Sequence, residues 1–596
     1  MVVARVPGLR LNPCMNPGGA QLQARELRKR VGFSDLALLF LILGGMWGAL
    51  HLGRQMWVRL DANALATIDM SLARIPAYAG RTLLRMWVAF GCSLFFTVVV
   101  GYAAAKSARA RALILPTLDV LQSVPVLGFL SVTVAGFMAL FPGNVLGVEC
   151  ASIFAIFTGQ VWNMAFGFYH SLRSIPTDLG EVALSYGLNR WQRFVTAELP
   201  AAIHSLLWNS MLSFGGGWFF VAQSEAISVM NKDIRLPGLG SYMAGAIERS
   251  DSHAALCAVV AMFLVIFLSD QLVWRPLLVW ADKFKLELTE SSERPTSWFY
   301  NVVKASLLLR LARQTASRLR ESFTCWMPPF RRDAVGALGV GRGGFLIMCR
   351  AVSYLLVLWL GVWLLRATVD AALEVHARVS LRELGGIVRM GGLTMLRVFA
   401  VTLLATLVWT PIGVWIGARP AVARVAQPLV QMAASFPVNM TFPFVVGLFV
   451  ACRVDMNWGS ILLIALGTQW YILFNVIAGS MAISNDLREA AAAFGLRRWA
   501  LWRTLILPAI FPFWVTGACT AAGGAWNASV VAEMASWGRT TLRAEGLGAF
   551  IADVTRQGNR PLILCGIGVM AFAVVLMNKL LWRPLYALAE RRCRMD

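Results

Sequence analysis

The side chains that could carry chemistry are sparse in this sequence of 596 residues. Its histidines, at His51, His170, His204, His253 and His376, form no H-E-x-x-H motif, and its ten cysteines include no C-x-x-C pair. No G-x-x-x-x-G-K-[ST] segment is present either, so the chain has no phosphate-binding loop of its own. The sequence therefore predicts neither catalytic residues nor a metal or cofactor site, and an integral-membrane enzyme is the least supported class.

Acidic, glycine and proline residues nevertheless recur at fixed spacing in two copies. The first copy holds Glu181, Ala183, Gly187, Leu199 and Pro200, and the second holds Glu489, Ala490, Ala491, Gly495, Leu507 and Pro508. In each copy a short helix is expected to stop at the glycine, and the proline suits the first turn of the next helix. Each copy is therefore predicted to be an elbow of two short helices that carries aromatic residues. A plain interfacial helix is the simpler interpretation, but the repeated spacing favours a docking element.

Polar residues also occur inside apolar segments, where they are costly unless they face protein or water. The candidate lining of a solute pathway comprises Ser123, Trp162, Asn163, Trp218, Gln223 and Glu225 in the first half, and Ser435, Trp470, Asn475, Trp526, Asn527 and Glu533 in the second. The competing interpretation of the two glutamates is a partly solvated structural carboxylate that pairs with an outer arginine. Arg85 and Arg397 are expected to extend to the membrane interface rather than to draw an anion inward.

The elements that must position these residues are membrane spans. The chain is 58% hydrophobic and 14% charged, with a mean hydropathy of +0.64, which is more apolar than a soluble domain of average makeup. A net charge of +23 would suit nucleic acid, yet arginines such as Arg25 and Arg28 cluster beside apolar segments, as in the positive-inside pattern. We therefore expect a multi-pass membrane protein that contacts the lipid bilayer and binds no nucleic acid.

Twelve apolar segments of the length that a bilayer requires are spread evenly over two halves. They are residues 35–52, 83–105, 114–140, 147–170, 203–229 and 254–280, followed by 345–366, 394–418, 426–451, 458–480, 511–534 and 562–582. Matching residues of the halves are 312 positions apart up to Ser123 and Ser435, and 308 apart from Trp162 and Trp470 onward. Six spans in each half give both halves the same orientation, which predicts a pseudo-twofold axis along the membrane normal.

The domain organisation follows from these segments. We predict a cytoplasmic N-terminal segment at 1–34, a first unit at 35–280, a basic cytoplasmic linker at 281–344 and a second unit at 345–590. Within the linker, residues 296–323 fit either an amphipathic helix on the membrane surface or a solvated tether. A cytoplasmic linker places the elbow loops 171–202 and 481–510 in the cytoplasm and the loops 231–253 and 535–561 outside.

Glu-Ala-Ala followed by glycine and then Leu-Pro resembles the coupling motif in permease subunits of binding-protein-dependent ABC importers. The first copy departs from it only in reading Glu-Val-Ala. The residues around Trp218 and Glu225, with Gly546-Leu-Gly548, look most like the branch for nitrate, sulfonates, taurine and related small anions. The resemblance implies an all-α polytopic membrane protein of two tandem six-helix type I permease units, with about twelve transmembrane helices. It also implies a location in a bacterial inner (cell) membrane.

The same resemblance implies partners. Two copies of a cytoplasmic ABC ATPase would dock on the elbows and hold the ATP and Mg²⁺, while this chain holds no cofactor. An extracytoplasmic solute-binding protein would deliver the solute, a small anion such as nitrate, a sulfonate, taurine or bicarbonate. The competing function is a twelve-span secondary transporter driven by an ion gradient, with Glu225, Glu533 or Asp270 as carriers of protons or sodium ions. Such a transporter has no need of paired elbows.

Overall fold

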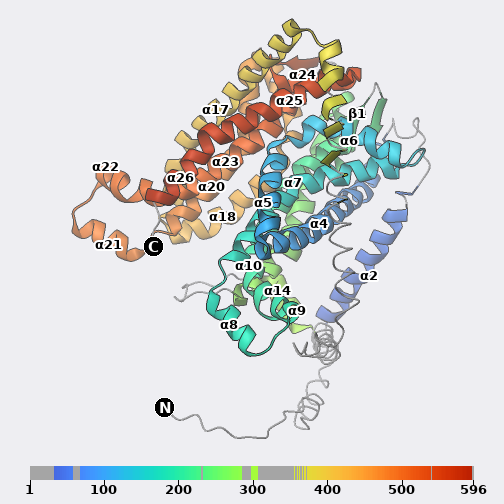
Figure 1. The fold of residues 1–596 in the computed structure, drawn as a ribbon. Helices are drawn as coiled ribbons and strands as arrows, with labels where there is room; N and C mark the ends of the chain where they lie inside the picture. The colour runs from blue at the N-terminus through green and yellow to red at the C-terminus, as the bar shows by residue number, and fades with distance from the viewer. Residues whose placement is uncertain are drawn as a thin grey trace, which may run out of the picture.

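The computed structural model describes residues 33–54, 56–57, 68–229, 232–284 and 297–306, single positions between 355 and 370, and residues 372–538 and 540–592 (Figure 1). The described chain is almost entirely helical, as predicted, with two short antiparallel β-hairpins added. Residues 1–32 of the predicted N-terminal segment, most of the linker and most of the predicted span 345–366 lie outside the described residues.

The described elements follow one order twice. The first half contains α2 (Phe33–Arg54), α4 (Ile75–Lys106), α5 (Ala108–Ser123), α6 (Val126–Leu140), α7 (Leu146–Arg173), α8 (Thr177–Ser185), α9 (Arg190–Arg193), α10 (Leu199–Ser224), β1 (Ala226–Val229), β2 (Lys232–Arg235), α11 (Leu239–Glu248), α12 (Ser252–Ser269) and α13 (Arg275–Ala281). After α14 (Trp298–Ala305) come α17 (Leu381–Gly417), α18 (Pro420–Ser435), α19 (Phe442–Cys452), α20 (Met456–Met481), α21 (Asn485–Ala493), α22 (Arg498–Leu501), α23 (Leu507–Ala532), β3 (Met534–Trp537), β4 (Thr540–Arg543), α24 (Leu547–Gln557), α25 (Arg560–Met577) and α26 (Arg583–Arg592). Each element from α4 to α13 has a counterpart between α17 and α26, which confirms the internal repeat.

Six described helical segments are long and apolar enough to cross a membrane. They are Leu72–Lys106, Ser252–Phe284, Leu381–Gly417, Met456–Met481, Arg498–Ala532 and Arg560–Ala589. The chain is therefore a multi-pass membrane protein, although the predicted count of twelve spans is not reached within the described residues.

The predicted third span of each half is wrong as a single helix. It is divided into α5 and α6 in the first half, and into α18 and α19 in the second. The chain is extended at Val124 (ψ 119°) and at Phe436 (ψ 130°), each of which precedes a proline. A proline ring clashes with a helical residue before it, so the helix ends there even though the hydropathy continues.

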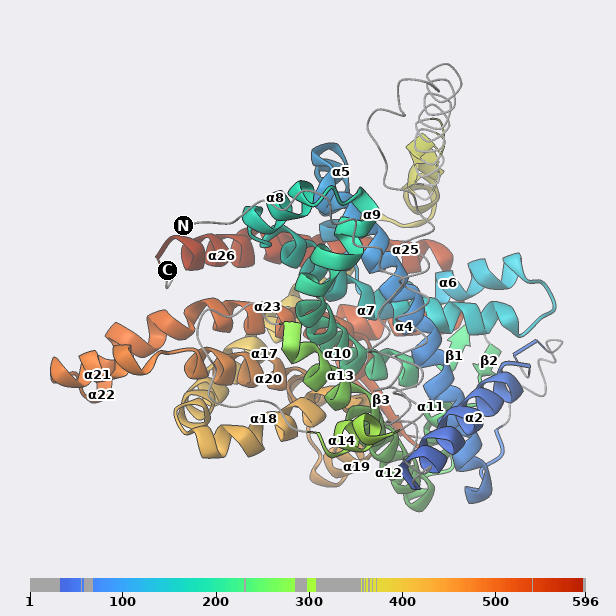
Figure 2. The same cartoon turned by 90° about the horizontal axis from the view of Figure 1, so that it is seen from below.

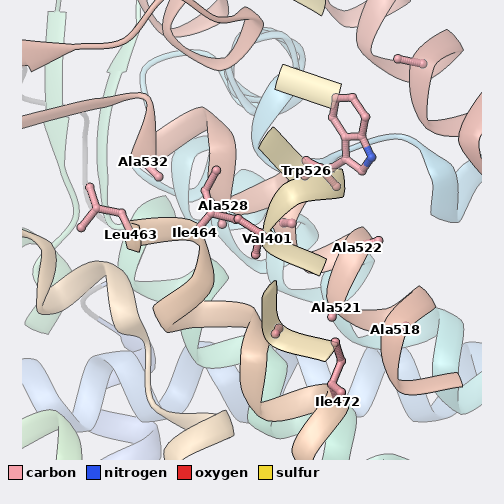
Figure 3. Close-up of a cluster of buried hydrophobic side chains, with 14 of the residues drawn as sticks. Val401, Leu463, Ile464, Ile472, Ala518, Ala521, Ala522, Trp526, Ala528 and Ala532 are labelled. Carbon is pink, nitrogen blue, oxygen red and sulfur yellow. The ribbon is translucent and has the colours of Figure 1, made fainter. Parts of the chain in front are cut away.

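Each half packs around its own core. In the second half, α20 packs along α23, where Ala518, Ala521 and Ala522 are buried and allow the two backbones to approach (Figure 3). Ile472 of α20 and Trp526 of α23 fill the space on either side of these small residues. The first half has the matching arrangement of α7 against α10.

The two halves meet along α10 and α23. Helix α10 packs on α18, α23 packs on α6, and the Oδ1 of Asn527 accepts a hydrogen bond of 2.8 Å from the Val126 backbone N–H. The Gly538 N–H also donates to the Ile247 carbonyl across the halves. Because α10 and α23 each follow an elbow and lead into a hairpin, the elbows and hairpins lie at opposite ends of the helices. We call these the elbow end and the hairpin end.

The two hairpins were not anticipated in the loops predicted to lie outside. They share one register, since Ala226 pairs with Arg235 in the first and Met534 pairs with Arg543 in the second, 308 residues later. Each hairpin leads into a short helix, α11 or α24, that packs back on the preceding long helix. Within the predicted linker, the described residues 297–306 include α14, which packs on α2 and α13, and the Ser306 hydroxyl donates to Asp35.

Candidate functional site

Each elbow turns at its glycine. Gly187 and Gly495 both have a φ of +67°, the left-handed conformation that ends a helix and that other residues rarely adopt. The backbone N–H of the residue after each glycine donates to the carbonyl of Ala183 or Ala491, which closes the turn. The predicted two-helix elbows, α8 with α9 and α21 with α22, are therefore present and project from separate sides of the molecule (Figures 1 and 2).

The outward surface of each elbow is aromatic. Tyr186 and Trp191 are 80% and 60% exposed in the first elbow, and Phe494 and Trp499 are 84% and 70% exposed in the second. Exposed clusters of large apolar side chains mark surfaces that bind a partner.

The residues of the repeated motif divide between this surface and the interior. Glu181, Glu489 and Ala490 are exposed, Ala183 and Ala491 are buried beneath the turn, and Leu199-Pro200 and Leu507-Pro508 begin α10 and α23.

A π-helical turn connects each elbow to the following long helix. Residues Phe194–Glu198 and Trp502–Ile506 form these turns immediately before the two Leu-Pro pairs. Proline cannot donate an N–H and its ring crowds the preceding turn, so the wider turn accommodates it without breaking the helix. Each elbow is thereby continuous with a helix that contacts the other half.

The elbows differ in how they are held. The carboxylate of Glu198 accepts from Lys106 of α4 at 2.6 Å and from Arg193 of α9 at 2.8 Å. The matching positions of the second half are Ala418, Ile506 and Leu501, which cannot form this network. There the N-cap of α21 is Ser484, and Arg488 donates to the Ser480 carbonyl.

An uncharged cavity of about 290 Å³ lies between the halves. Four predicted pathway residues line it: Asn163, Ser435, Asn475 and Asn527. Ser213, a polar residue of the predicted fifth span, lines it as well. Sequence reasoning missed other polar lining residues, namely Asn209, Thr468, Tyr471, Thr516 and Thr520. All of them lie on α10, α20 or α23, so polar residues within these apolar helices could have indicated the rest of the cavity lining. The lining includes no charged side chain.

The remaining predicted pathway residues lie elsewhere. Gln223 lines a second cavity at the hairpin end. Trp218 and Trp526 are 1% exposed in the cores of their halves, and Trp162 and Trp470 are half-buried away from both cavities. Ser123 ends α5 at the break before α6.

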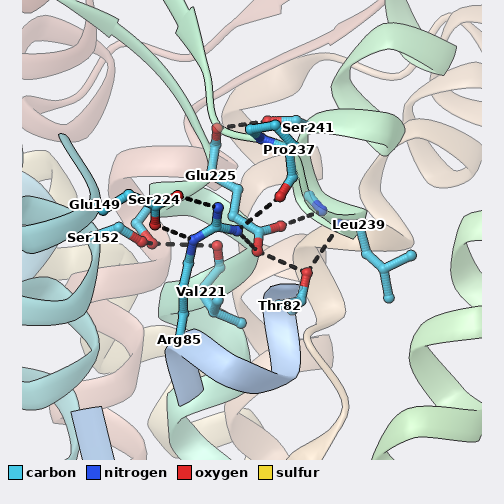
Figure 4. A network of polar contacts seen from close by, with 11 residues as sticks. Thr82, Arg85, Glu149, Ser152, Val221, Ser224, Glu225, Pro237, Leu239 and Ser241 are labelled. Carbon is cyan, nitrogen blue, oxygen red and sulfur yellow. Dashed lines mark hydrogen bonds and ion pairs between the residues drawn. The ribbon is translucent and has the colours of Figure 1, made fainter. Parts of the chain in front are cut away.

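A buried charge cluster joins three helices at the hairpin end of the first half (Figure 4). The Arg85 guanidinium of α4 donates to both Glu149 oxygens at 2.6 and 2.7 Å and to Glu225 at 2.7 Å. Glu225 also accepts from the Thr82 hydroxyl and from the Gly240 backbone N–H. Every member is thus held by charge-assisted hydrogen bonds, which offset the cost of burial.

The second half repeats this cluster with one change. Arg397 pairs with Glu533 at 2.9 Å, and Glu533 accepts from Thr394 and from the Gly548 N–H. Where the first half has Glu149, the second has Asn457, whose Oδ1 accepts from Arg397 at 2.8 Å.

The burial of both clusters corrects two expectations from the sequence. Glu225 and Glu533 are 0% exposed, not partly solvated, and Arg85 and Arg397 are buried instead of extending to the interface. The reason is that each guanidinium finds carboxylate or amide oxygens within the protein, so neither side chain needs water.

Two glycines in each half are required by this packing. A Cβ at Gly238 would overlap the Glu225 carboxylate, and one at Gly546 would overlap that of Glu533. A Cβ at Gly240 or Gly548 would collide with the backbone of the preceding long helix. The Gly-Leu-Gly segments therefore let α11 and α24 dock against α10 and α23, and the clusters lock them there.

Within the described part of the chain, no three His, Cys, Asp or Glu side chains gather where they could hold a metal ion. Glu225, Glu533 and the half-buried Asp270 are each paired with an arginine, Asp270 with Arg275 at 2.8 Å. What remains is a polar cavity between two halves and an exposed aromatic elbow on each of them.

Comparisons with known proteins agree with this architecture. The family model described as "Binding-protein-dependent transport system inner membrane component" matches residues 97–273 and again residues 409–594, together more than half of the chain.

Curated relatives include the nitrate import permease protein NrtB of Leptolyngbya laminosa, 26% identical over 30% of this chain and 60% of the relative. Others are the taurine transport system permease protein TauC of Escherichia coli, 26% identical over 35% of this chain and 67% of the relative, and the glycine betaine/carnitine transport permease protein GbuB of Listeria monocytogenes, 28% identical over 30% and 58%. The match to the nitrate permease thus spans less than two thirds of that protein. From the two family matches and the duplicated fold, the chain belongs to the family of binding-protein-dependent transport system inner membrane components, with two copies of the family's domain in one polypeptide.

Proposed function

We propose that this chain forms the complete membrane pathway of an ATP-driven importer, with both permease units in one polypeptide. Two cytoplasmic ABC ATPase subunits dock on the elbows and hold the ATP and Mg²⁺, and an extracytoplasmic binding protein delivers the solute to the hairpin end. The observation that carries the proposal is the pair of exposed aromatic elbows, each continuous with a helix that lines the cavity.

The coupling route is short. Each elbow enters α10 or α23 through its π-helical turn, and these two helices supply much of the cavity wall. When the ATPase subunits close, they move the elbows, and the long helices tilt against each other. Differential binding of the closed ATPase pair to one arrangement of the halves shifts the pathway from one side to the other.

The solute proposed is a small molecule with an oxyanion group. The cavity offers amide groups of Asn163, Asn209 and Asn475 and several hydroxyls, all of which donate hydrogen bonds to oxyanions. The relatives named above act on nitrate, taurine and glycine betaine or carnitine. These solutes share an oxyanion and differ in net charge, which suits a cavity that has hydrogen-bond donors and no fixed charge.

A secondary transporter is less well supported. Its proposed ion carriers, Glu225, Glu533 and Asp270, are each paired with an arginine, and the two glutamates have no exposed surface. A carrier of protons or sodium ions needs alternating access to water.

The elbow glycines provide the test. Proline cannot adopt a positive φ, so Gly187→Pro combined with Gly495→Pro should distort both elbows while α10 and α23 still form. We expect the double variant to insert in the membrane and to lose transport-linked ATP hydrolysis in proteoliposomes that contain the ATPase subunits. Gly143→Pro is the matched control, since Gly143 has a similar φ of +72° in the loop between α6 and α7. Unchanged coupling in the double variant would refute the docking role.

A further inference from the structure

A second cavity, of about 200 Å³, lies between the halves at the hairpin end. Helix α6, β1 and α24 meet there (Figure 1). The two cavities follow each other along the same helices, because Phe219 and Phe220 line the first and Gln223 lines the second, about one helical turn later. On α23, Ala528 lines the first and Val531 lines the second. The hairpin-end cavity is therefore the next compartment of the same pathway.

Arg556 is the one charged side chain that lines either cavity among the described residues. It is accompanied by the Thr555 hydroxyl and the Gln223 carboxamide, so a cation and two neutral donors face one space from opposite halves. None of these three side chains forms a hydrogen bond or ion pair with another residue that the structure describes. The rest of the wall is mainly apolar, as at Leu127 and Val530, and Arg556 is itself an exposed residue, so the cavity is open to solvent on the side of its cation.

The first half shows that the fold does not demand this arginine. The position that matches Arg556 is Glu248, which ends α11 and pairs with Arg235 of its hairpin. In the second half the hairpin arginine, Arg543, pairs instead with Asp553 at 2.7 Å, one helical turn before Arg556. Both halves thus keep an ion pair between the hairpin arginine and the following helix, but its carboxylate stands at different positions of that helix, Glu248 in the first half and Asp553 in the second. This difference leaves position 556 with a cation that faces the interface.

The two neutral donors depart from the repeat as well. Gln223 corresponds to Val531, and Thr555 corresponds to Ile247. The polar groups of this cavity therefore stand at positions where the twin half is apolar or acidic, so the site occurs once and not twice. A cationic site next to an uncharged cavity is the arrangement expected where an anion first loses its hydration water.

We propose that the hairpin-end cavity is an entry site that captures a small oxyanion, a nitrate or a sulfonate, on Arg556, Thr555 and Gln223 before it reaches the uncharged cavity. This inference rests on the proposed import function, which makes the hairpin end the side of entry. It adds a single asymmetric site that the second half supplies with its charge.

The test measures the local potential in the full chain, reconstituted in nanodiscs without partners. A cysteine introduced by Ala552→Cys lines the cavity and can be labelled with 2-sulfonatoethyl methanethiosulfonate, an anionic sulfonate, or with a cationic trimethylammonium analogue. Labelling is quantified at that residue by peptide mass spectrometry, so native cysteines do not interfere. Removing the charge with Arg556→Gln should lower the anionic-to-cationic rate ratio about fivefold, and nitrate should slow the anionic labelling in the parent protein but not in the Gln variant.

The matched control is Arg560→Gln, which removes an arginine at the start of α25 that lies near Glu374 and does not line the cavity; its rate ratio should stay unchanged. Val531→Cys is a second labelling position should Ala552→Cys fail to fold. An unchanged ratio in Arg556→Gln, or an absence of nitrate protection in the parent, would overturn the entry site. Because the measurement needs no ATPase, it separates this outcome from a failure of the elbows to couple.

Discussion

The two halves of this chain share their geometry and differ in their charges. Both elbows keep a glycine at a φ of +67°, and both hairpin ends keep the Thr-Arg-Glu cluster with its docking glycines. The first elbow is tied to α4 through Lys106 and Glu198, whereas the matching positions of the second half, Ala418 and Ile506, carry no charge. Positions that set backbone conformation are thus repeated, while the charged groups around them have diverged.

The buried clusters show how such a divergence is balanced. The first half has an extra acid, Glu149, where the second has Asn457, and it also has an extra base, Arg81, where the second has Leu393. Arg81 lies close enough to Glu149 and Arg85 to interact electrostatically with both. Each cluster is therefore close to neutral overall, as burial requires.

The largest expected loss of stability comes from removing the buried arginines, and it should differ between the two clusters. Arg85→Met leaves two carboxylates without their main partner, while Arg397→Met leaves one. Breaking a buried pair costs about 3–5 kcal/mol, so Arg85→Met should lower the thermal unfolding midpoint of the purified protein more than Arg397→Met does. Adding Glu149→Gln to Arg85→Met should recover part of the loss. Equal midpoints for the two methionine variants would contradict the difference between the clusters.

An intermediate loss of stability is expected from substitution of the docking glycines, which both halves share. Gly238→Ala and Gly546→Ala each place a methyl group against a buried glutamate. Overpacking of this kind costs about 1–3 kcal/mol, and the two variants should lower the unfolding midpoint by similar amounts. Gly136→Ala, which meets open space, is the control. A marked inequality between the first two variants would show that the docking of α11 and α24 is not equivalent.

The smallest effect concerns the tie of the first elbow. Lys106 is 33% exposed and Glu198 is 8% exposed, so Glu198→Gln should weaken the elbow by less than about 1 kcal/mol. We expect faster hydrogen exchange in residues 190–198 of this variant, approaching that of residues 498–506, which have no such tie. If the two segments already exchange equally in the parent protein, the ion pairs do not stiffen the elbow.

Much of this architecture could be predicted because local rules decide it. The left-handed turns at Gly187 and Gly495 follow from glycine and spacing, and the internal repeat follows from residue matching. The helix break before Pro125 could also have been predicted from the proline, but a hydropathy window averages over it and shows one continuous apolar segment. The pairing of Arg85 with Glu149 and Glu225 was not accessible, since it joins residues 64 and 140 positions apart. Such contacts depend on how the helices pack and not on any local pattern.

The lining of the cavities could be predicted only in part. Asn163 and Asn475 could be proposed as pathway residues because polar groups in apolar helices need a polar surrounding. Trp218 satisfied the same rule, yet it lies in the core, since an indole ring is large and apolar enough to be buried there. The facing direction of a helix is what the sequence left undetermined.

The most direct test of the central claim is solute uptake by proteoliposomes that contain this chain, its ATPase subunits and its binding protein. We expect uptake of nitrate or taurine to require ATP in the compartment that the elbows face, and an imposed proton or sodium gradient not to replace it. Uptake by the purified chain alone, driven by an ion gradient without ATPase subunits, would refute ATP-driven import.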